Sequence, residues 1–395
     1  MYRTLEVLGP EHEYSIVDER LNSLPIVDKV IKELKGKIVN TVSCNGFSFG
    51  KELQSHVAEI KATKPFPSPT IFEDTMYEAV LKINDVLERH FHAHLMGGGM
   101  HPLLDLNDAR IWSHRDRSIY KAMDDLFNIR QHGWLNIQSF QLNLSYSSEP
   151  DGVRLHNVIS TILPYLPAIS AASPIYEARI GAYVDNRLYF YKNNQKEVPS
   201  IIGDVIPEYI TSFKKYREVT IEKYSNELQT LNADACLINK EWLNSRGAIF
   251  RFDRNAIEIR VMDEQECVKS DVALSCFIRA LLRGLFNENE QLPHNLLVED
   301  FNRVIREGLS ARVLYPNAQT AQPVCLHFYD VATKHALEDE KRYLWLIKKR
   351  ILEGNLSNLI ARDVCTRAQK TSQVEAIRDI YLKLVSSLSR NEPYS

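Results

Sequence analysis

The sequence predicts an α+β protein with a mainly antiparallel sheet, helices over one face and a polar, concave second face. Strand-like and helix-like segments alternate irregularly along the 395 residues. Several strand-like segments carry charged residues on one side only. Helical patterns dominate from about residue 290 onward. We therefore expect a first domain over residues 1–289 and a helical subdomain over residues 290–395.

An expected strand around Glu258 shows the one-sided charge most clearly. Alternate residues of a strand point to opposite faces, so Ile257, Ile259 and Val261 form an apolar face. Glu258 and Arg260 share the other face. This pair suits a metal-bound, phosphate-bearing ligand, because Glu binds the cation and Arg holds phosphate oxygens with paired hydrogen bonds. For one strand alone, two charges that simply face water are the alternative, since most charged residues are exposed.

Carboxylates also mark two segments near the N-terminus. Glu11 and Glu13 stand two residues apart on an expected strand, so both project from one side. Residues 50–63 read as another strand, in which Glu52 and Glu59 point to opposite faces unless a bulge intervenes. Close carboxylates repel, and a cation relieves that repulsion. Oxygen ligands favour Mg²⁺ or Mn²⁺. The alternative is that these strands face solvent and water hydrates their carboxylates.

Helical patterns account for much of the remaining chain. A capping box formed by Thr70 and Glu73 marks the start of one long helix. The stretch 179–250 gives no clear pattern. Other helices are expected over residues 25–34, 117–131, 151–171 (interrupted by Pro164 and Pro167), 268–286, 341–352 and 372–388.

Two further segments carry candidate polar ligands. Gln141 and Asn143 share one face of an expected strand over residues 140–146, where amides can bind a metal or substrate or form cross-strand pairs. The glycine run at 97–99 lets a backbone approach a ligand closely, or forms a plain turn. His101 follows it, and a histidine there is more often structural than ligating.

Composition argues against several classes of protein. The net charge of −3 and a pI near 6.5 do not fit a nucleic-acid-binding protein. We expect no membrane span, because no run of 18 apolar residues occurs. The N-terminus lacks an apolar leader segment. The six cysteines are scattered without a Cys-x-x-Cys pair, so reduced thiols and a cytoplasmic location are expected.

Five segments resemble, in the same order, the second type of glutamate–cysteine ligase, a group that includes bacterial carboxylate-amine ligases. No single motif is specific, but the ordered set is. The segments are Gly9-Pro10-Glu11-His12-Glu13, Val57-Ala58-Glu59-Ile60, Gly97-Gly98-Gly99-Met100-His101-Pro102 and the stretches 166–174 and 257–263.

The resemblance implies a glutamine-synthetase-like fold, in which a curved antiparallel sheet forms a funnel for ATP and Mg²⁺ or Mn²⁺. Residues 1–289 would then be the catalytic ligase domain. It also implies that ATP phosphorylates a carboxylate, typically the γ-carboxyl of glutamate, and that an amine attacks the acyl phosphate. Phosphoryl transfer needs mainly charge neutralisation and positioning, which agrees with the candidate residues. We expect small amino acid or amine substrates and a homo-oligomer.

The same resemblance assigns roles to individual side chains. Arg260 would contact phosphate, with His101 as a second candidate, and Arg187 would lie on the substrate side. The expected metal ligands are Glu11, Glu13, Glu59 and Glu258, with Glu52 and Asn143 as further candidates.

One strand departs from the family pattern. The family commonly has His-x-His where this chain has Gln141-Leu142-Asn143. An amide can bind a metal through oxygen but carries no proton charge. The alternative function is therefore a catalytically weak or inactive member that binds nucleotide or amino acid as a sensor or partner protein.

Overall fold

The computed structural model describes residues 2–288, 291–315 and 317–395. Its centre is an eight-stranded sheet in the order β2-β3-β4-β1-β6-β10-β9, with β5 also paired to β1. Every pairing in this sheet is antiparallel. The strands are β1 (Leu8–Asp18), β2 (Thr41–Ser43), β3 (Phe47–Lys51), β4 (Val57–Ala62), β5 (Ala93–Met96), β6 (Ser139–Ser145), β9 (Ala248–Arg251) and β10 (Ala256–Asp263), and β7 (Ile175–Tyr176) and β8 (Arg179–Ile180) form a separate hairpin.

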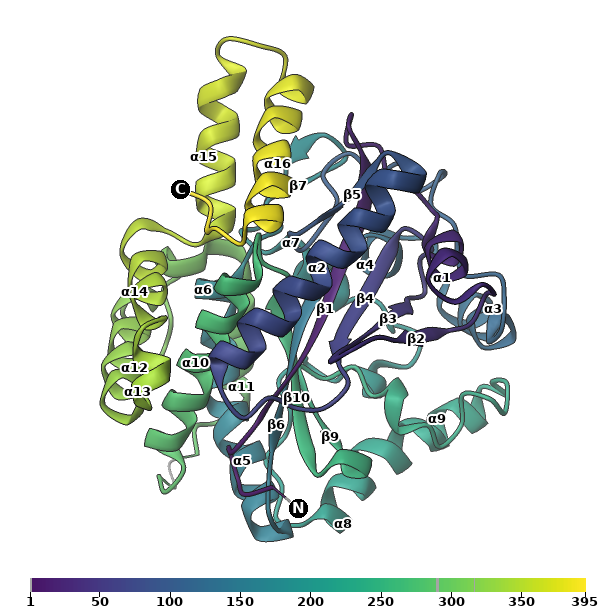
Figure 1. Cartoon of the computed structure of the whole chain (residues 1–395). Helices are drawn as coiled ribbons and strands as arrows, with labels where there is room; N and C mark the ends of the chain where they lie inside the picture. Colours follow the sequence, from purple (N-terminus) through teal and green to yellow (C-terminus); the bar gives the residue numbers. More distant parts are fainter. Residues whose placement is uncertain (1, 289–290, 316) are drawn as a thin grey trace.

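Helices cover one face of this sheet. The long helices α2 (Pro69–Phe91) and α10 (Val268–Leu285) run across it (Figure 1). The β1 residues His12 and Tyr14 point to this side, where the ring of His12 lies 5.9 Å from that of Phe72 on α2. Because strand residues alternate, Glu11 and Glu13 point to the opposite face. The α+β fold predicted from the sequence is confirmed.

The remaining helices surround this centre. Towards the N-terminus and middle of the chain lie α1 (Val27–Lys35), α3 (Arg117–Phe127), α4 (His132–Leu135), α5 (Glu149–Ile162), α6 (Pro167–Ser170), α7 (Asn186–Tyr191), α8 (Phe213–Tyr216) and α9 (Lys223–Thr230). The C-terminal part adds α11 (His294–Glu307), α12 (Ala321–His335), α13 (Glu338–Lys341), α14 (Leu344–Glu353), α15 (Leu356–Ala368) and α16 (Gln373–Arg390).

The C-terminal region is helical, as predicted. Residues between 292 and 351 share one hydrophobic core with the sheet and α10. The pair α15 and α16 projects from the rest of the molecule (Figure 1) and packs with Val17, Leu21 and Met96 in a second cluster. The division at residues 289 and 290 stays a prediction, because both residues lie outside the described ranges.

The prediction of a single strand over residues 50–63 is wrong. The segment forms the end of β3, a connection and β4. The connection pairs with another part of the chain: Ser55 donates its N–H to the Arg110 carbonyl, and Trp112 donates to the Leu53 carbonyl. These long-range hydrogen bonds hold the backbone out of the β3–β4 ladder. Glu52 and Glu59 therefore reach the same side of the sheet without a bulge.

The capping box expected at Thr70 is also wrong. Helix α2 begins two residues earlier, where Ser68 accepts a hydrogen bond from the Ile71 N–H at 3.4 Å and Pro69 takes the first position. Glu73 instead accepts hydrogen bonds from Tyr343 and Asn391, both far along the chain. A local motif was thus overridden by tertiary contacts.

Among the described residues, no helix combines the length and the apolar character that crossing a membrane requires.

Candidate active site

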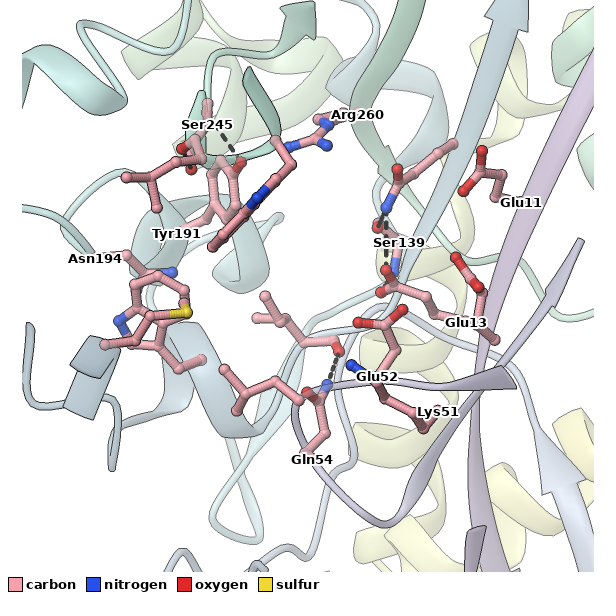
Figure 2. Close-up of a pocket in the computed structure, with 18 of the residues that line it drawn as sticks. Glu11, Glu13, Lys51, Glu52, Gln54, Ser139, Tyr191, Asn194, Ser245 and Arg260 are labelled. Carbon is pink, nitrogen blue, oxygen red and sulfur yellow. Dashed lines mark hydrogen bonds between the residues drawn. The ribbon is translucent and has the colours of Figure 1, made fainter. Parts of the chain in front are cut away.

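A cavity of about 420 Å³ opens on the face of the sheet that α2 and α10 leave uncovered. Acidic, basic and aromatic side chains share its walls. Figure 2 shows the carboxylates of Glu11, Glu13 and Glu52 on one side, with Tyr191 and Ser245 across from them. The charged residues that line it are Glu11, Glu13, Glu52, Glu59 and Asp116 together with Lys51, Lys61, Arg187, Arg251, Arg254 and Arg260.

The acidic wall comes from β1, β4 and the end of β3. In the β1–β4 ladder Glu13 lies directly opposite Glu59. Like charges in directly opposed positions destabilise a sheet. Glu52, which follows β3, lines the same space. Three carboxylates thus line one cavity, where a bound cation would offset their negative charge.

The acidity of these groups reflects the crowding. Burial, with a contribution from Glu52, raises the pKa of Glu59 to about 8. Burial raises the pKa of Glu13 to about 7, against the stabilising Ser139 N–H, and burial and Glu13 raise the pKa of Glu52 to about 7. Close to neutral pH these carboxyls retain protons, which a cation would displace.

Glu11 differs from its neighbours. Burial acts to raise the pKa of its carboxyl, but Lys61 and Arg254 outweigh burial and hold it at about 2. Arg254 donates to Glu11 Oε1 at 2.7 Å, and Asn143 donates to the same oxygen at 3.1 Å. Glu11 is therefore ionised over the whole physiological range.

The amides of Gln141 and Asn143, where the resemblance implies histidines, both contact these glutamates. Gln141 donates to Glu13 Oε1 at 3.0 Å, while the Ser139 N–H donates to Oε2 at 2.7 Å. Asn143 donates to the Gly9 carbonyl and to Glu11. Gln141 lines the cavity, whereas Asn143 lines a neighbouring cavity that shares Glu11 with the first. The two amides orient carboxylates and hold no charge.

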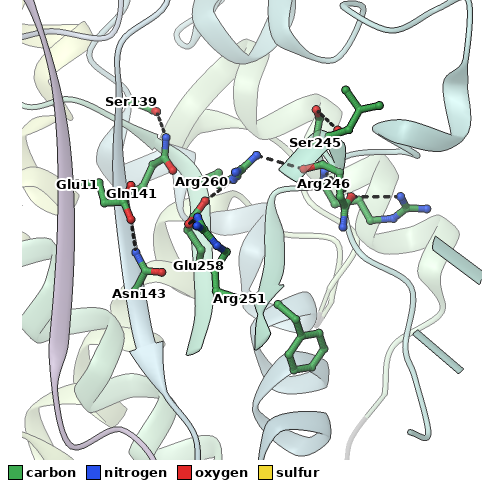
Figure 3. Close-up of polar contacts among 12 residues, drawn as sticks. Glu11, Ser139, Gln141, Asn143, Ser245, Arg246, Arg251, Glu258 and Arg260 are labelled. Atoms are coloured by element: carbon green, nitrogen blue, oxygen red, sulfur yellow. Dashed lines mark hydrogen bonds and ion pairs between the residues drawn. The ribbon is translucent and has the colours of Figure 1, made fainter. Parts of the chain in front are cut away.

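Glu258 and Arg260 lie on one face of β10, as predicted, but the Glu258 carboxylate does not face water. Glu258 is fully buried. One of its oxygens accepts from Arg260 Nε at 2.6 Å and the other pairs with Arg251 of β9, as Figure 3 shows. Arg251 and Arg260 line the cavity and Glu258 does not. In this geometry Glu258 positions the guanidinium groups of Arg251 and Arg260. Its role as a metal ligand stays a prediction.

Arg187 also lines the cavity and is almost fully buried. It forms an ion pair with Asp263 and donates to the Arg260 carbonyl at 3.4 Å. Asp263 also accepts from the Ala172 N–H at 2.7 Å. The glycine run explains how this carboxylate fits, because a Cβ at Gly99 would collide with it. The close approach that glycine permits here is to Asp263.

Gly99→Ala is expected to destabilise the protein by about 2 kcal/mol, the cost of overpacking a buried position. The added methyl must push the Asp263 carboxyl away from Arg187, so ligand binding in the cavity should weaken as well. Denaturant unfolding measures the first effect and calorimetry the second. A variant as stable as the wild type would contradict this reading of the glycine run.

The phosphate-binding prediction for His101 is not supported. His101 is fully buried, and its Nδ1 accepts from the Leu103 N–H at 3.1 Å. Its backbone exchanges hydrogen bonds with the Asn136 side chain. It is not among the residues that line the cavity. Its environment is that of a structural histidine in the protein interior.

Most of the basic wall and the whole aromatic wall were not predicted from the sequence. Lys61 accompanies Glu59 on β4 at a spacing of two residues, and their side chains pair at 2.5 Å. That alternation was a usable signal. Arg254 follows β9 in a short turn and offers no comparable pattern. The aromatic wall is made by Tyr120, Trp134, Tyr191 and Trp242, which come from separate segments.

The metal-free protein is expected to lose stability as the pH rises from about 6 to about 8.5. The pKa values of Glu13, Glu52 and Glu59 lie above the ordinary value of 4.5, so the folded state binds protons more tightly than the unfolded chain. This stabilisation is complete below about pH 4.5 and disappears as the pH passes through about 7 to 8.

Mg²⁺ competes with those protons, so it should raise Tm more at the higher pH. Thermal unfolding at about pH 6 and at about pH 8.5, with and without Mg²⁺, measures the difference in Tm. An equal effect of Mg²⁺ at both pH values would argue against cation binding by these carboxylates.

Comparison with solved structures finds the same fold in a glutamate–cysteine ligase and in a bifunctional glutathione synthetase. The chain superimposes on glutamate–cysteine ligase of Francisella tularensis, determined with AMP, with a TM-score of 0.61 over 98% of this chain and 90% of that chain, at 13% identity. The bifunctional glutathione synthetase of Pasteurella multocida gives a TM-score of 0.61, with 96% of this chain covering 52% of that one at 14% identity.

Sequence comparison then gives the family. Residues 7–383 match the model of glutamate-cysteine ligase family 2, and the chain belongs to that family. A relative in Archaeoglobus fulgidus, described only as an uncharacterized protein, is 46% identical over 98% of this chain and all of its own length. The resemblance inferred from the five sequence segments is confirmed.

Proposed function

We propose that the protein is an ATP-dependent carboxylate-amine ligase that forms an amide through the acyl phosphate of a carboxylate, such as the γ-carboxyl of glutamate. The observation that carries the proposal is the pairing of Glu13 with Glu59 beside Glu52, within one cavity that also holds a wall of arginines. AMP in the Francisella structure supports a nucleotide as one occupant.

The donor set fits Mg²⁺ or Mn²⁺. These ions prefer oxygen ligands, and Mg²⁺ is usually bound by one or two carboxylates together with phosphate oxygens. Glu11, Glu13, Glu52 and Glu59 would hold the cation, and their raised or lowered pKa values reflect a site built around charge. When bound, the cation neutralises phosphate charge during transfer.

The basic wall supplies the second requirement of phosphoryl transfer. Glu258 fixes the guanidinium groups of Arg251 and Arg260, and both arginines line the cavity, so they could bind phosphate oxygens without first being ordered. A carboxylate oxygen of the acid attacks the γ-phosphorus, an O–P bond forms and ADP leaves. The amine nitrogen then attacks the acyl carbon, phosphate leaves with the C–O electron pair, and the nitrogen loses a proton.

The test is turnover with a broad panel of amines. Purified protein with ATP, Mg²⁺ and glutamate should release ADP and phosphate when a suitable amine is added. With glutamate labelled by ¹⁸O in its carboxyl groups, one labelled oxygen should appear in phosphate. Metal-dependent ATP binding without turnover would instead support the sensor or partner function.

The small-molecule substrates follow from this proposal. The cytoplasmic location and the homo-oligomeric state stay predictions.

A further inference from the structure

A second group of ligating side chains lies behind the sheet, and the proposed reaction does not use it. His12 comes from β1, Glu264 follows β10, and Asp271 lies in the first turn of α10. Each is fully buried, and one ligand atom from each lies within 4.8 Å of the others. We propose that His12, Glu264 and Asp271 bind a divalent transition-metal ion of the zinc class as a structural site.

The His12–Glu264 distance is that of a hydrogen bond, whereas the His12–Asp271 distance is that between two ligands of one zinc ion. His12 Nδ1 lies 3.0 Å from Glu264 Oε1 and 3.5 Å from Asp271 Oδ2. The Tyr14 hydroxyl lies 3.2 Å from the same nitrogen. Two ligands of a tetrahedral zinc, each about 2.0–2.2 Å from the metal, stand about 3.3–3.5 Å apart. One hydrogen on Nδ1 can serve only one of these oxygens well.

The charges point the same way. Among the described residues, neither Glu264 nor Asp271 forms an ion pair with a lysine or arginine. A protonated His12 would supply one positive charge against two negative charges in a site without water contact. Buried charges require compensation. A divalent cation bound to a neutral imidazole and two carboxylates makes the group neutral.

Asp271 provides an independent observation. Both of its carboxylate oxygens are buried and lack a hydrogen-bond donor among the described residues. Leaving a buried polar group unsatisfied costs about 1–3 kcal/mol, and more for a charged one. A metal beside His12 Nδ1 would supply the missing partner, because Oδ2 already points at that nitrogen.

The position of the group indicates what such an ion would do. Glu264 uses its second oxygen, Oε2, to accept the N–H of Glu13 at 3.1 Å. The site therefore joins the helical layer to the strand that carries the cavity glutamates. An ion there would hold β1 and α10 together directly behind Glu13, without touching substrate.

The experiment measures metal content with zinc as the probe. The full-length chain is unfolded in guanidinium with EDTA, refolded with or without one equivalent of Zn²⁺, and dialysed against metal-free buffer. We expect about one retained zinc per chain, a higher Tm with zinc, and an X-ray absorption spectrum with nitrogen and oxygen ligands that include one histidine. His12→Gln and Asp271→Asn should each lower the retained zinc at least tenfold.

Glu59→Gln separates this site from the cavity, because it changes a carboxylate on the other face of the sheet. It should retain zinc like the wild type. Loss of zinc in Glu59→Gln, with retention in Asp271→Asn, would overturn the proposal. A wild-type chain that retains no zinc and has the same Tm after both refolding procedures would also overturn it. This last result needs no variant, so it decides the matter even if the substituted chains do not fold.

Discussion

Glu59→Gln is expected to lower kcat by about 10³-fold, the scale of losing one preorganised electrostatic group in an active site. Glu59 lies opposite Glu13 and beside Glu52, so it contributes charge to the proposed cation site from a second strand. Glutamine keeps the volume and removes the charge. Steady-state release of ADP, once an amine substrate is known, measures the loss.

The same substitution should stabilise the metal-free protein at about pH 8. It removes one of two directly opposed carboxylates, a change worth about 1 kcal/mol. Lower activity with higher stability is the signature of a charge kept for function. Thermal unfolding without Mg²⁺ tests this second effect.

Glu338→Gln is the matched control for Glu59→Gln. The Glu338 side chain is 90% exposed and pairs with Lys341 on the surface, so stability should change by less than about 0.5 kcal/mol and kcat not at all. If Glu59→Gln kept the kcat of this control, Glu59 would have no part in the reaction.

Glu258→Gln is expected to cost about 3 kcal/mol of stability and most of the turnover. The carboxylate is fully buried between Arg251 and Arg260, and removing one partner of a buried ion pair leaves charge uncompensated. Released from Glu258, the two guanidinium groups should also bind phosphate less well, so KM for ATP should rise. Denaturant unfolding and ATP titration measure the two effects separately.

Glu208→Gln controls for the loss of an ion pair elsewhere. Glu208 accepts two hydrogen bonds from the buried Arg246, at 2.7 and 2.8 Å, and neither residue lines the cavity. This variant should lose stability and keep its KM for ATP. If both variants changed stability alone, Glu258 would have only a structural role.

Strand alternation predicted part of the site because it is a local property. Spacing alone placed Glu11 and Glu13 on one face of β1, and Glu258 and Arg260 on one face of β10. The sequence could not show that both carboxylate oxygens of Glu258 form ion pairs with arginines, because Arg251 lies on the neighbouring strand. Strand pairing is a long-range property, and it decides which side chains meet.

Glu52 and the aromatic wall illustrate the same limit. Glu52 reaches the cavity because the segment after it pairs with residues 110–112, a contact that no local pattern records. Tyr120 and Trp134 come from α-helices, and Trp242 from a short 3-10 helix, so no shared periodicity linked them. The glycine-rich motif led to the prediction that His101 binds phosphate. In the structure His101 is buried and has the environment of a structural histidine.

In the proposed function, Glu13 and Glu59 hold a divalent cation for ATP. A crystal structure with Mn²⁺ and a non-hydrolysable ATP analogue, with anomalous data at the manganese edge, tests it most directly. We expect an anomalous peak between the two carboxylates, with nucleotide phosphate oxygens as further ligands and Arg260 in contact with the phosphates. Bound analogue with no manganese between Glu13 and Glu59 would contradict it.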